Sequence, residues 1–316
     1  MRQNLRRVAI IVPFLDNLSV LALCLKSILD CLPNGTNVIL IDDGSTANPE
    51  DDVVLAPLLK HQNVICIRHS ENKGPGAARN TGLRWCWQNN IEIAILLDSD
   101  CIVSSDFVQA HLASHDRYAT AICIGGAIRG SGGNFWAKLD GIMSWFTSIP
   151  GSPERAVKPP LHIPTTNMSL KLTPSKKYFL QFDEHVRTGE DVAFVKNLWK
   201  AGEDVRFFPV PEVVHLDRTR FSDFIRHQYR WGLHTYIVRF GMGNLGIFRR
   251  LIFITIFFPL APVYALLATW INMRPWLKTH TADFFFAPVV FLIYVIKAAA
   301  VIHGTLDPKA VIRNLQ

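Results

Sequence analysis

The chain has 316 residues, 49% of them hydrophobic, and a formal net charge of +7. A mean hydropathy of +0.18 is high for a soluble enzyme, and the longest apolar runs follow Leu251. Six cysteines without a CxxC pair argue against a disulfide scaffold or a zinc site and predict reduced thiols in the core. No nucleic-acid motif accompanies the basic charge, so we expect no nucleic-acid partner.

The N-terminal residues predict a strand followed by a helix. Val8–Val12 is typical of a buried strand, which Pro13 stops. This run is too short for a signal peptide, so we expect the N-terminal domain to stay in the cytoplasm. Apolar residues at helical spacing predict a helix over Leu18–Leu32, with Asn17 as its N-cap and Asp16 as the alternative.

A second strand, Asn37–Ile41, ends in acids at Asp42-Asp43-Gly44-Ser45, and a third covers Val64–Ile67. The next loop, Asn72–Asn80, holds two glycines around a proline and opens a helix over Ala77–Trp87. Backbone N–H groups at a helix start can bind a diphosphate, and the basic side chains of this loop would help. An ordinary turn between strand and helix is the alternative.

The run Ile91–Asp100 predicts a strand that is buried on both faces. It ends in Asp98 and Asp100 with Ser99 between them. Residues two apart on an extended chain point the same way, so both carboxylates would converge at the sheet edge where α/β folds bind ligands. A divalent cation that bridges to phosphate oxygens fits there. An Asx-turn is the competing interpretation.

Further elements follow in the second half of the chain. We expect a strand over Ala121–Ala127, an amphipathic helix over Asn134–Phe146 that covers the sheet or touches lipid, and a strand over His162–Leu172. The polar Thr165-Thr166-Asn167 inside that last strand would bond a sugar or the protein's own backbone. Two short strands, Val205–Val210 and Val213–Val214, come later.

Thr188-Gly-Glu-Asp191 opens a clear helix over Val192–Lys200. The two acids suit the helix dipole, so simple capping explains them; the alternative is that Asp191 or Glu190 is a catalytic base. His215 ends the strand after this helix and is either a plain polar residue or a further metal ligand. Because helices alternate with strands, the pattern favours a parallel sheet with the polar loops on one edge.

Six motifs in this order resemble the family 2 glycosyltransferases, over roughly residues 8–235. They are Val12-Pro13, Asp42–Ser45, Asn72–Gly82, Asp98-Ser-Asp100, Gly189-Glu-Asp191 and His215. The resemblance implies an α/β GT-A fold (Rossmann-like, with a mostly parallel sheet) and an inverting, nucleotide-sugar-dependent transferase.

The resemblance also implies roles for individual residues. Pro13, Asp16 and Asp43 would hold the base and ribose of the nucleotide, and Lys73 and Arg79 would lie near the base or diphosphate. Asp98 and Ser99 would lie on the ribose side. A Mg²⁺ or Mn²⁺ ion would be bound by Asp98, Asp100 and His215. Asp191, with Glu190 beside it, would be the general base. Asn167, Arg230 and Trp231 would lie on the acceptor or diphosphate side.

Two departures from the family pattern bear on specificity. Asp16-Asn17 stands where an Asn-Glu pair is usual after the proline. His227 replaces the glutamine of the Gln-x-x-Arg-Trp motif of processive members, ahead of Gln228-Tyr-Arg-Trp231. The second departure favours transfer of a single sugar over polymerisation.

The C-terminal region holds two apolar runs, Leu251–Ile271 and Phe284–Ile302, joined by the short linker Asn272–Asp283. Either run is long enough to cross a bilayer, so we expect a transmembrane hairpin. Arg249 and Arg250 precede it, and Lys309 and Arg313 follow it; they place both ends in the cytoplasm, although Arg274 and Lys278 in the linker oppose this. Interfacial or re-entrant helices are the alternative, favoured by Pro259, Pro262 and Lys297.

The sequence therefore predicts a catalytic domain at residues 1–235, a basic amphipathic interface segment at 236–250, and two hydrophobic helices at 251–316. Residues 218–250 carry seven arginines and one acid, which suits anionic lipid. We expect an enzyme on the cytoplasmic face of the cell membrane, with a nucleotide-sugar donor and a lipid-linked or membrane-proximal acceptor. A nucleotidyltransferase and a catalytically inactive membrane scaffold are the alternatives.

Overall fold

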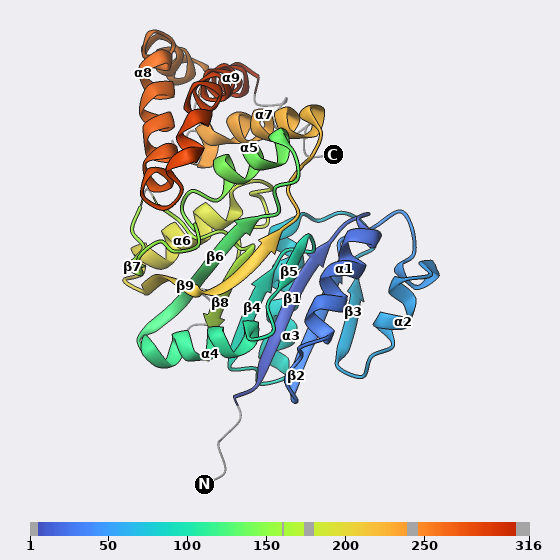
Figure 1. Ribbon diagram of the computed structural model, residues 1–316. Helices are drawn as coiled ribbons and strands as arrows, with labels where there is room; N and C mark the ends of the chain where they lie inside the picture. The colour runs from blue at the N-terminus through green and yellow to red at the C-terminus, as the bar shows by residue number, and fades with distance from the viewer. Residues whose placement is uncertain (1–5, 160, 174–179, 239–245, 308–316) are drawn as a thin grey trace. The chain divides into compact units, whose positions relative to one another are not determined.

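The computed structural model describes residues 6–159, 161–173, 180–238 and 246–307. The chain divides into two compact units (Figure 1). The first unit comprises Met1–Arg129, Pro150–His185 and Glu190–Leu216, and the second comprises Gly130–Ile149, Val186–Gly189 and Asp217–Gln316. In this division the segment Gly130–Ile149 belongs with the C-terminal helices.

The first unit is built on one mixed sheet with the order β3-β2-β1-β4-β8-β6-β9-β5, and β7 pairs with β9. Its strands are β1 Val8–Phe14, β2 Thr36–Asp42, β3 Val64–Arg68, β4 Ile93–Leu97, β5 Cys101–Val103, β6 Ala121–Gly130, β7 Arg155–Ala156, β8 Asn167–Lys171 and β9 Asp204–His215. Strands β1 to β4 pair in parallel, whereas β8 pairs antiparallel with both β4 and β6. The α/β class is confirmed, but the parallel pairing covers only the N-terminal strands.

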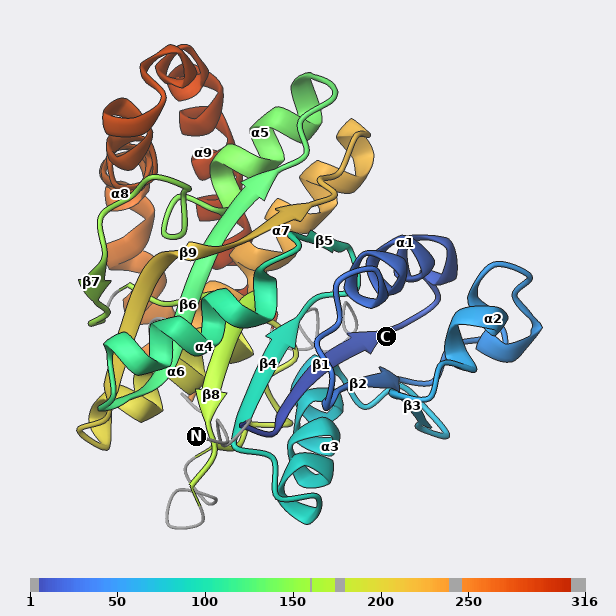
Figure 2. The same ribbon diagram turned by 60° about the horizontal axis from the view of Figure 1, so that its bottom comes forward.

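Helices cover both faces of this sheet (Figure 2). They are α1 Leu18–Leu29, the short η1 Pro49–Asp51, α2 Leu55–Leu59, α3 Pro75–Gln88, α4 Phe107–Arg117 and α6 Glu190–Lys200. Helices α3 and α6 pack on one face, where Ala78, Leu83 and Phe194 share a buried cluster with Ile11 and Ile39. Every residue of β4 is buried, as the apolar run predicted.

Three local predictions differ from the structure. The strand expected over His162–Leu172 begins only at Asn167, because the chain turns between Pro164 and Asn167. The two short strands expected over Val205–Val214 form the single strand β9. Asn17 occupies the N-cap position of α1, but its side chain donates to Ser99 Oγ at 2.7 Å and does not cap the helix.

A buried polar cluster joins α4 to β8. His111 lies with Nδ1 3.0 Å from Ser169 Oγ and Nε2 2.9 Å from Asn167 Oδ1. His115 Nε2 lies 3.0 Å from the same Ser169 hydroxyl. Burial lowers the pKa of His111 to about 4 and the pKa of His115 to about 3. Both rings are therefore neutral in the folded protein at neutral pH.

This cluster predicts a loss of stability in mild acid. The folded pKa values lie below the unfolded value of 6.5, so the unfolded chain binds more protons once the pH falls below 6.5. Between pH 6.5 and pH 5 we expect each histidine to lower the free energy of unfolding by about 2 kcal/mol. Urea unfolding of the full chain at the two pH values measures this. His111→Asn should flatten the dependence, whereas His61→Asn at an exposed position should leave it unchanged.

The second unit consists of helices: α5 Phe135–Ser144, α7 Phe221–Val238, α8 Ile247–Thr279, η3 Thr281–Phe286 and α9 Ala287–Leu306. Helix α5, which was expected to cover the sheet or touch lipid, belongs to this helical unit. Its residues Leu139, Ile142 and Met143 pack in one cluster with Met273 of α8 and Ile293 of α9.

Helix α8 continues through most of the predicted linker. Asn272 Nδ2 donates to the Met143 carbonyl at 3.2 Å, and Trp276 Nε1 donates to the Ile142 carbonyl at 3.0 Å. These bonds to α5 stabilise the last two turns of α8, so only residues 280–286 separate it from α9. The linker boundary at Asn272 is therefore wrong.

Helices α8 and α9 are long and apolar enough to be candidate membrane spans. Twelve large apolar side chains of α8 between Ile247 and Ile271 are exposed. Arg239, Lys309, Arg313 and part of the predicted 236–250 segment lie outside the described residues.

Candidate active site

Three parallel strands of the first unit end beside one cavity. The carboxyl ends of β1, β2 and β4 and the start of α3 enclose a volume of about 280 Å³. Its lining residues are Pro13, Phe14, Leu15, Asp43, Asn72, Pro75, Ala78, Arg79, Asp98, Ser99 and Asp100. Six residues predicted from separate motifs (Pro13, Asp43, Arg79, Asp98, Ser99 and Asp100) thus come together.

Asp43 builds the loop that leads into α3. Its Oδ1 accepts the backbone N–H of Lys73 at 3.0 Å and lies 2.8 Å from His69 Nδ1, while Oδ2 accepts the N–H of Gly74 at 2.8 Å. Gly44 beside it has φ +86°, and a Cβ there would lie 2.6 Å from the Glu71 carbonyl carbon. The acid at the end of β2 therefore fixes the start of α3, with the Lys73 side chain exposed next to it.

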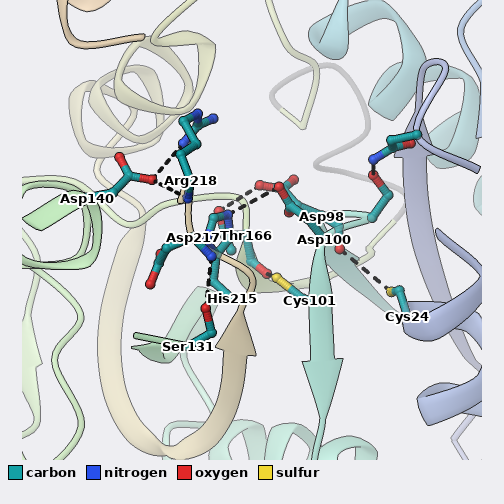
Figure 3. A network of polar contacts seen from close by, with 12 residues as sticks. Cys24, Asp98, Asp100, Cys101, Ser131, Asp140, Thr166, His215, Asp217 and Arg218 are labelled. Carbon is teal, nitrogen blue, oxygen red and sulfur yellow. Dashed lines mark hydrogen bonds and ion pairs between the residues drawn. The ribbon is translucent and has the colours of Figure 1, made fainter. Parts of the chain in front are cut away.

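Asp98 is held on both oxygens. Arg79 Nη2 donates to Oδ1 at 2.7 Å. The Thr166 hydroxyl donates to Oδ2, also at 2.7 Å (Figure 3). Arg79 also donates through Nη1 to Glu190 Oε1 at 2.7 Å, so it bridges β4 to the start of α6. Burial raises the pKa of Glu190 to about 7, and Arg79 opposes that rise. Arg79 is itself buried, so this bridge is shielded from solvent.

Asp100 lies next to His215. Pairing of β5 with β9 sets Cys101 opposite His215, and the Leu216 N–H donates to the Asp100 carbonyl at 2.8 Å. As a result Asp100 Oδ2 and His215 Nε2 are 3.3 Å apart. Figure 3 shows both side chains near Asp98 at the end of β4.

This pair fits a divalent metal of the Mn²⁺ type. Manganese accepts both carboxylate and imidazole ligands, whereas Mg²⁺ prefers oxygen alone. Within the described ranges, no cluster of three or more His, Cys, Asp or Glu side chains is placed to hold a metal. Two protein ligands would therefore leave several coordination positions for oxygens of a bound diphosphate and for water.

Asp191 lies in the first turn of α6. Its Oδ1 accepts the Val192 N–H at 2.7 Å, and its Oδ2 lies 3.7 Å from His162 Nε2. Its side chain remains 19% exposed, whereas that of Glu190 is 11% exposed and hydrogen bonded to Arg79. Of the two acids, Asp191 is thus better placed to receive a proton from a substrate.

Other predicted residues lie away from the cavity lining. Asp16 stabilises the loop after β2, since its Oδ1 accepts both the N–H and the hydroxyl of Thr46 at 2.7 and 2.8 Å. Asn167 is fully buried and donates to the Ala127 and Pro211 carbonyls at 2.8 and 3.0 Å. Arg230 and Trp231 belong to α7 in the second unit.

The sequence did not predict the partners of two residues at the site. Thr166 was expected to bond a sugar or the protein's own backbone and instead donates to the Asp98 side chain, and His162 was expected only as the start of a strand. Their partners Asp98 and Asp191 are 68 and 29 positions away, so no local pattern reveals the pairs. A hydroxyl inside an apolar run was the available signal for Thr166, because a buried hydroxyl needs a partner.

Comparison with known proteins supports the family resemblance. The sequence model described as glycosyl transferase family 2 matches residues 9–179. The pre-mycofactocin glycosyltransferase of Mycobacterium tuberculosis is 28% identical over 233 residues, which cover 72% of this chain and 46% of that protein. The glycosyltransferase GlyG of Streptococcus pneumoniae is 28% identical over 137 residues, covering 42% of this chain and 44% of that protein. The chain thus spans less than half the length of these curated relatives.

Solved structures share the fold. The mannosyltransferase PcManGT from Pyrobaculum calidifontis, in complex with GDP-Man and Mn²⁺, superposes with a TM-score of 0.59 at 16% identity, covering 95% of this chain and 88% of that one. GalNAc-T7 with UDP, GalNAc and Mn²⁺ has a TM-score of 0.51 at 17% identity, covering 73% of this chain and 51% of that one. Because the family match spans more than half of the 316 residues, this chain belongs to glycosyl transferase family 2.

Proposed function

We propose that this glycosyltransferase moves one sugar, with inversion, from a nucleotide-sugar donor to a hydroxyl or phosphate of a lipid-linked or membrane-proximal acceptor. It works on the cytoplasmic face of the cell membrane. The observation that carries the proposal is the single cavity that Asp43, Arg79, Asp98 and Asp100 share at the ends of three parallel strands. Ligands bind at this edge in α/β folds, and a cavity with carboxylates and a helix start suits a nucleotide diphosphate.

Donor binding is assigned to residues from separate loops. Pro13, Asp43 and Ser99 line the side for the base and ribose, with Asp16 and Lys73 on the adjoining loops. Arg79 is engaged with two carboxylates, so we assign it to shaping the cavity and not to direct pairing with the diphosphate. Asp98 is held by Arg79 and Thr166 in a fixed orientation, which suits a hydrogen bond to a ribose hydroxyl.

Asp191 serves as the general base. One carboxylate is enough for an inverting displacement, because it removes the proton from the acceptor oxygen as that oxygen attacks the sugar. The hydrogen bond from the Val192 N–H orients the carboxylate through Oδ1, and Oδ2 lies on the His162 side. Glu190 and Arg79 behind it hold the first turn of α6 in place.

Asp100 and His215 would hold the divalent metal. When bound, a metal at this pair supplies Lewis-acid stabilisation of the negative charge on the leaving diphosphate. We expect Asp100→Ala to remove metal-dependent donor binding, because the remaining imidazole is a single ligand. Calorimetric titration of donor with Mn²⁺ and with EDTA measures the loss. Donor affinity that still depends on Mn²⁺ in Asp100→Ala would contradict the metal assignment.

A thermal-shift panel tests the proposed function as a whole. The detergent-purified chain is heated with UDP-, GDP- and dTDP-sugars and with free nucleoside triphosphates, each with Mn²⁺ and with EDTA. A metal-dependent rise in Tm with one donor class is expected. No shift with any of the donors, in a protein that unfolds cooperatively, would contradict nucleotide-sugar binding and favour an inactive scaffold. A shift with free nucleoside triphosphates alone would favour a nucleotidyltransferase.

A further inference from the structure

The outer face of α8 is a continuous apolar surface that the rest of the second unit does not cover. Its members Ile256, Phe258, Leu260, Leu266, Leu267 and Trp270 are each more than half exposed. Monomeric proteins rarely expose apolar surface of this extent, so it marks an interaction site. Exposed cations lie at both ends of the helix: Arg249 near its start, and Arg274 and Lys278 near its end.

The opposite side of α8 and α9 rests on α5 and α7 at two separate places. One hydrophobic cluster joins Phe224 of α7 to Met273 and Trp276 of α8 and to Val290 of α9. A second cluster joins Leu233 of α7 to other parts of the same two helices, around Phe257 and Ala298 to Val301. Helix α7 thus packs along α9 over several turns, and residues of α8 belong to both clusters.

The turn between α8 and α9 is also tied to α5. Asp283 Oδ2 lies 3.0 Å from Lys138 Nζ, and the Phe286 ring stacks on that of Phe135 with centroids 5.3 Å apart. At the other end of α9, His303 Nδ1 lies 2.7 Å from the Tyr229 hydroxyl of α7. The turn before α9 therefore contacts α5, and the C-terminal end of α9 contacts α7.

A bilayer-spanning α9 would conflict with these contacts. Twenty residues at about 1.5 Å each make α9 about 30 Å long, so Lys297 near its midpoint would lie near the bilayer centre. Yet Lys297 is buried against Trp231, its Nζ 4.9 Å from the ring, and Gly232 touches the α9 backbone there. The neighbouring Arg226 and Arg230 are exposed and would enter hydrocarbon, which disfavours charged side chains.

We propose that α8 and α9 form a monotopic raft, in which the outer face of α8 enters a single leaflet and the exposed cations at its two ends contact anionic lipid headgroups. A helix that lies in the interface with its apolar face buried in the headgroup boundary satisfies all of these contacts. The turn of the hairpin and helix α7 then face the same side of the membrane. This inference is independent of sugar transfer, because it concerns only the second unit.

Labelling of single cysteines tests the orientation. The full chain with Cys31→Ser and Cys66→Ser, the two cysteines that are not buried, is placed in sealed membrane vesicles. Ser222→Cys on α7 is the reference, and Thr281→Cys in the turn is the probe; both positions are exposed. If Thr281→Cys does not fold, the exposed Ala282→Cys replaces it. The raft predicts that a membrane-impermeant maleimide labels probe and reference from the same side.

Labelling from opposite sides would overturn the raft and establish a spanning hairpin. Protection of the probe until detergent is added, with the reference labelled, would also overturn it.

Lipid dependence tests the occupant of the apolar face. The raft predicts tighter binding to phosphatidylglycerol vesicles than to phosphatidylcholine vesicles, measured by flotation. Each of Arg249→Gln, Arg274→Gln and Lys278→Gln should weaken binding to the anionic vesicles by about fivefold, which corresponds to about 1 kcal/mol per basic residue. A stable dimer that binds neither vesicle would assign the outer face of α8 to a second copy of the chain and overturn the lipid assignment.

Discussion

Replacement of Asp191 by asparagine is expected to lower kcat by about 10²–10⁴, the usual contribution of a general base. The amide keeps an oxygen that can accept the Val192 N–H, so the start of α6 should be preserved. Because Asp191 does not line the donor cavity, donor affinity should stay near that of the parent chain. Initial rates over a range of acceptor concentrations, together with donor titration, separate the two effects.

His162→Gln is the matched control for this variant. It changes the neighbour of Asp191 Oδ2 and leaves the carboxylate in place. A loss of kcat much smaller than that of Asp191→Asn is expected. If Asp191→Asn turns over at the parental rate, Asp191 has no part in the mechanism and the base must be sought elsewhere.

Replacement of Arg79 by methionine should lower the free energy of unfolding by about 3–5 kcal/mol, as expected when one partner of a buried ion pair is removed. Asp98 and Glu190 would both lose a charged hydrogen bond of 2.7 Å. The pKa of Glu190, already raised by burial, should rise further once Arg79 no longer opposes it. The folded state would then hold a proton that the unfolded chain releases, so the loss should grow as the pH rises from 6 to 8.

An exposed pair provides the comparison for Arg79. Arg117 Nη2 lies 2.7 Å from Glu154 Oε1, the same distance, but the two side chains are 56% and 39% exposed. Arg117→Met should therefore change stability little, because solvent screens surface ion pairs. Urea unfolding of both variants and of the parent chain at pH 6 and pH 8 measures the free energy of unfolding on which the comparison rests. Equal stability of Arg79→Met and the parent chain would show that the bridge does not stabilise the fold.

Local sequence patterns predicted the N-terminal half of the fold. Strands β1, β2 and β4 and helix α3 follow from short apolar runs with turn residues at their ends, and the acids after β2 and β4 lie in one cavity as expected. These features depend on neighbours in the chain. The topology of parallel strands then brings the separate strand ends together.

Features that depend on distant partners were not predictable. The antiparallel pairing of β8 with β4 and β6, and the bridge from Arg79 to Glu190 across 111 positions, have no local signature. A helix is amphipathic whether it packs on a sheet or on other helices, so the helical spacing of apolar residues in α5 could not predict which of the two it contacts. Likewise, the hydropathy of residues 272–279 gave no sign that Asn272 and Trp276 would find carbonyl partners on α5.

Helix α3 sets the spacing of parts of the first unit that are far apart in the chain. Its first residues are fixed by Asp43, Arg79 reaches Asp98 and Glu190, and Asn80 pairs with both the N–H and the carbonyl of Phe182 at 2.8 and 2.9 Å. The Asn80 side chain therefore makes the same two hydrogen bonds with Phe182 that the backbone of a neighbouring strand would make. One residue added between Gly74 and Arg79 would turn the rest of the helix by about 100° relative to the start that Asp43 holds, and would break the contacts of Arg79 and Asn80 together. The length of this short segment is thus under a tighter constraint than that of any surface loop, and natural variation in chain length should avoid it.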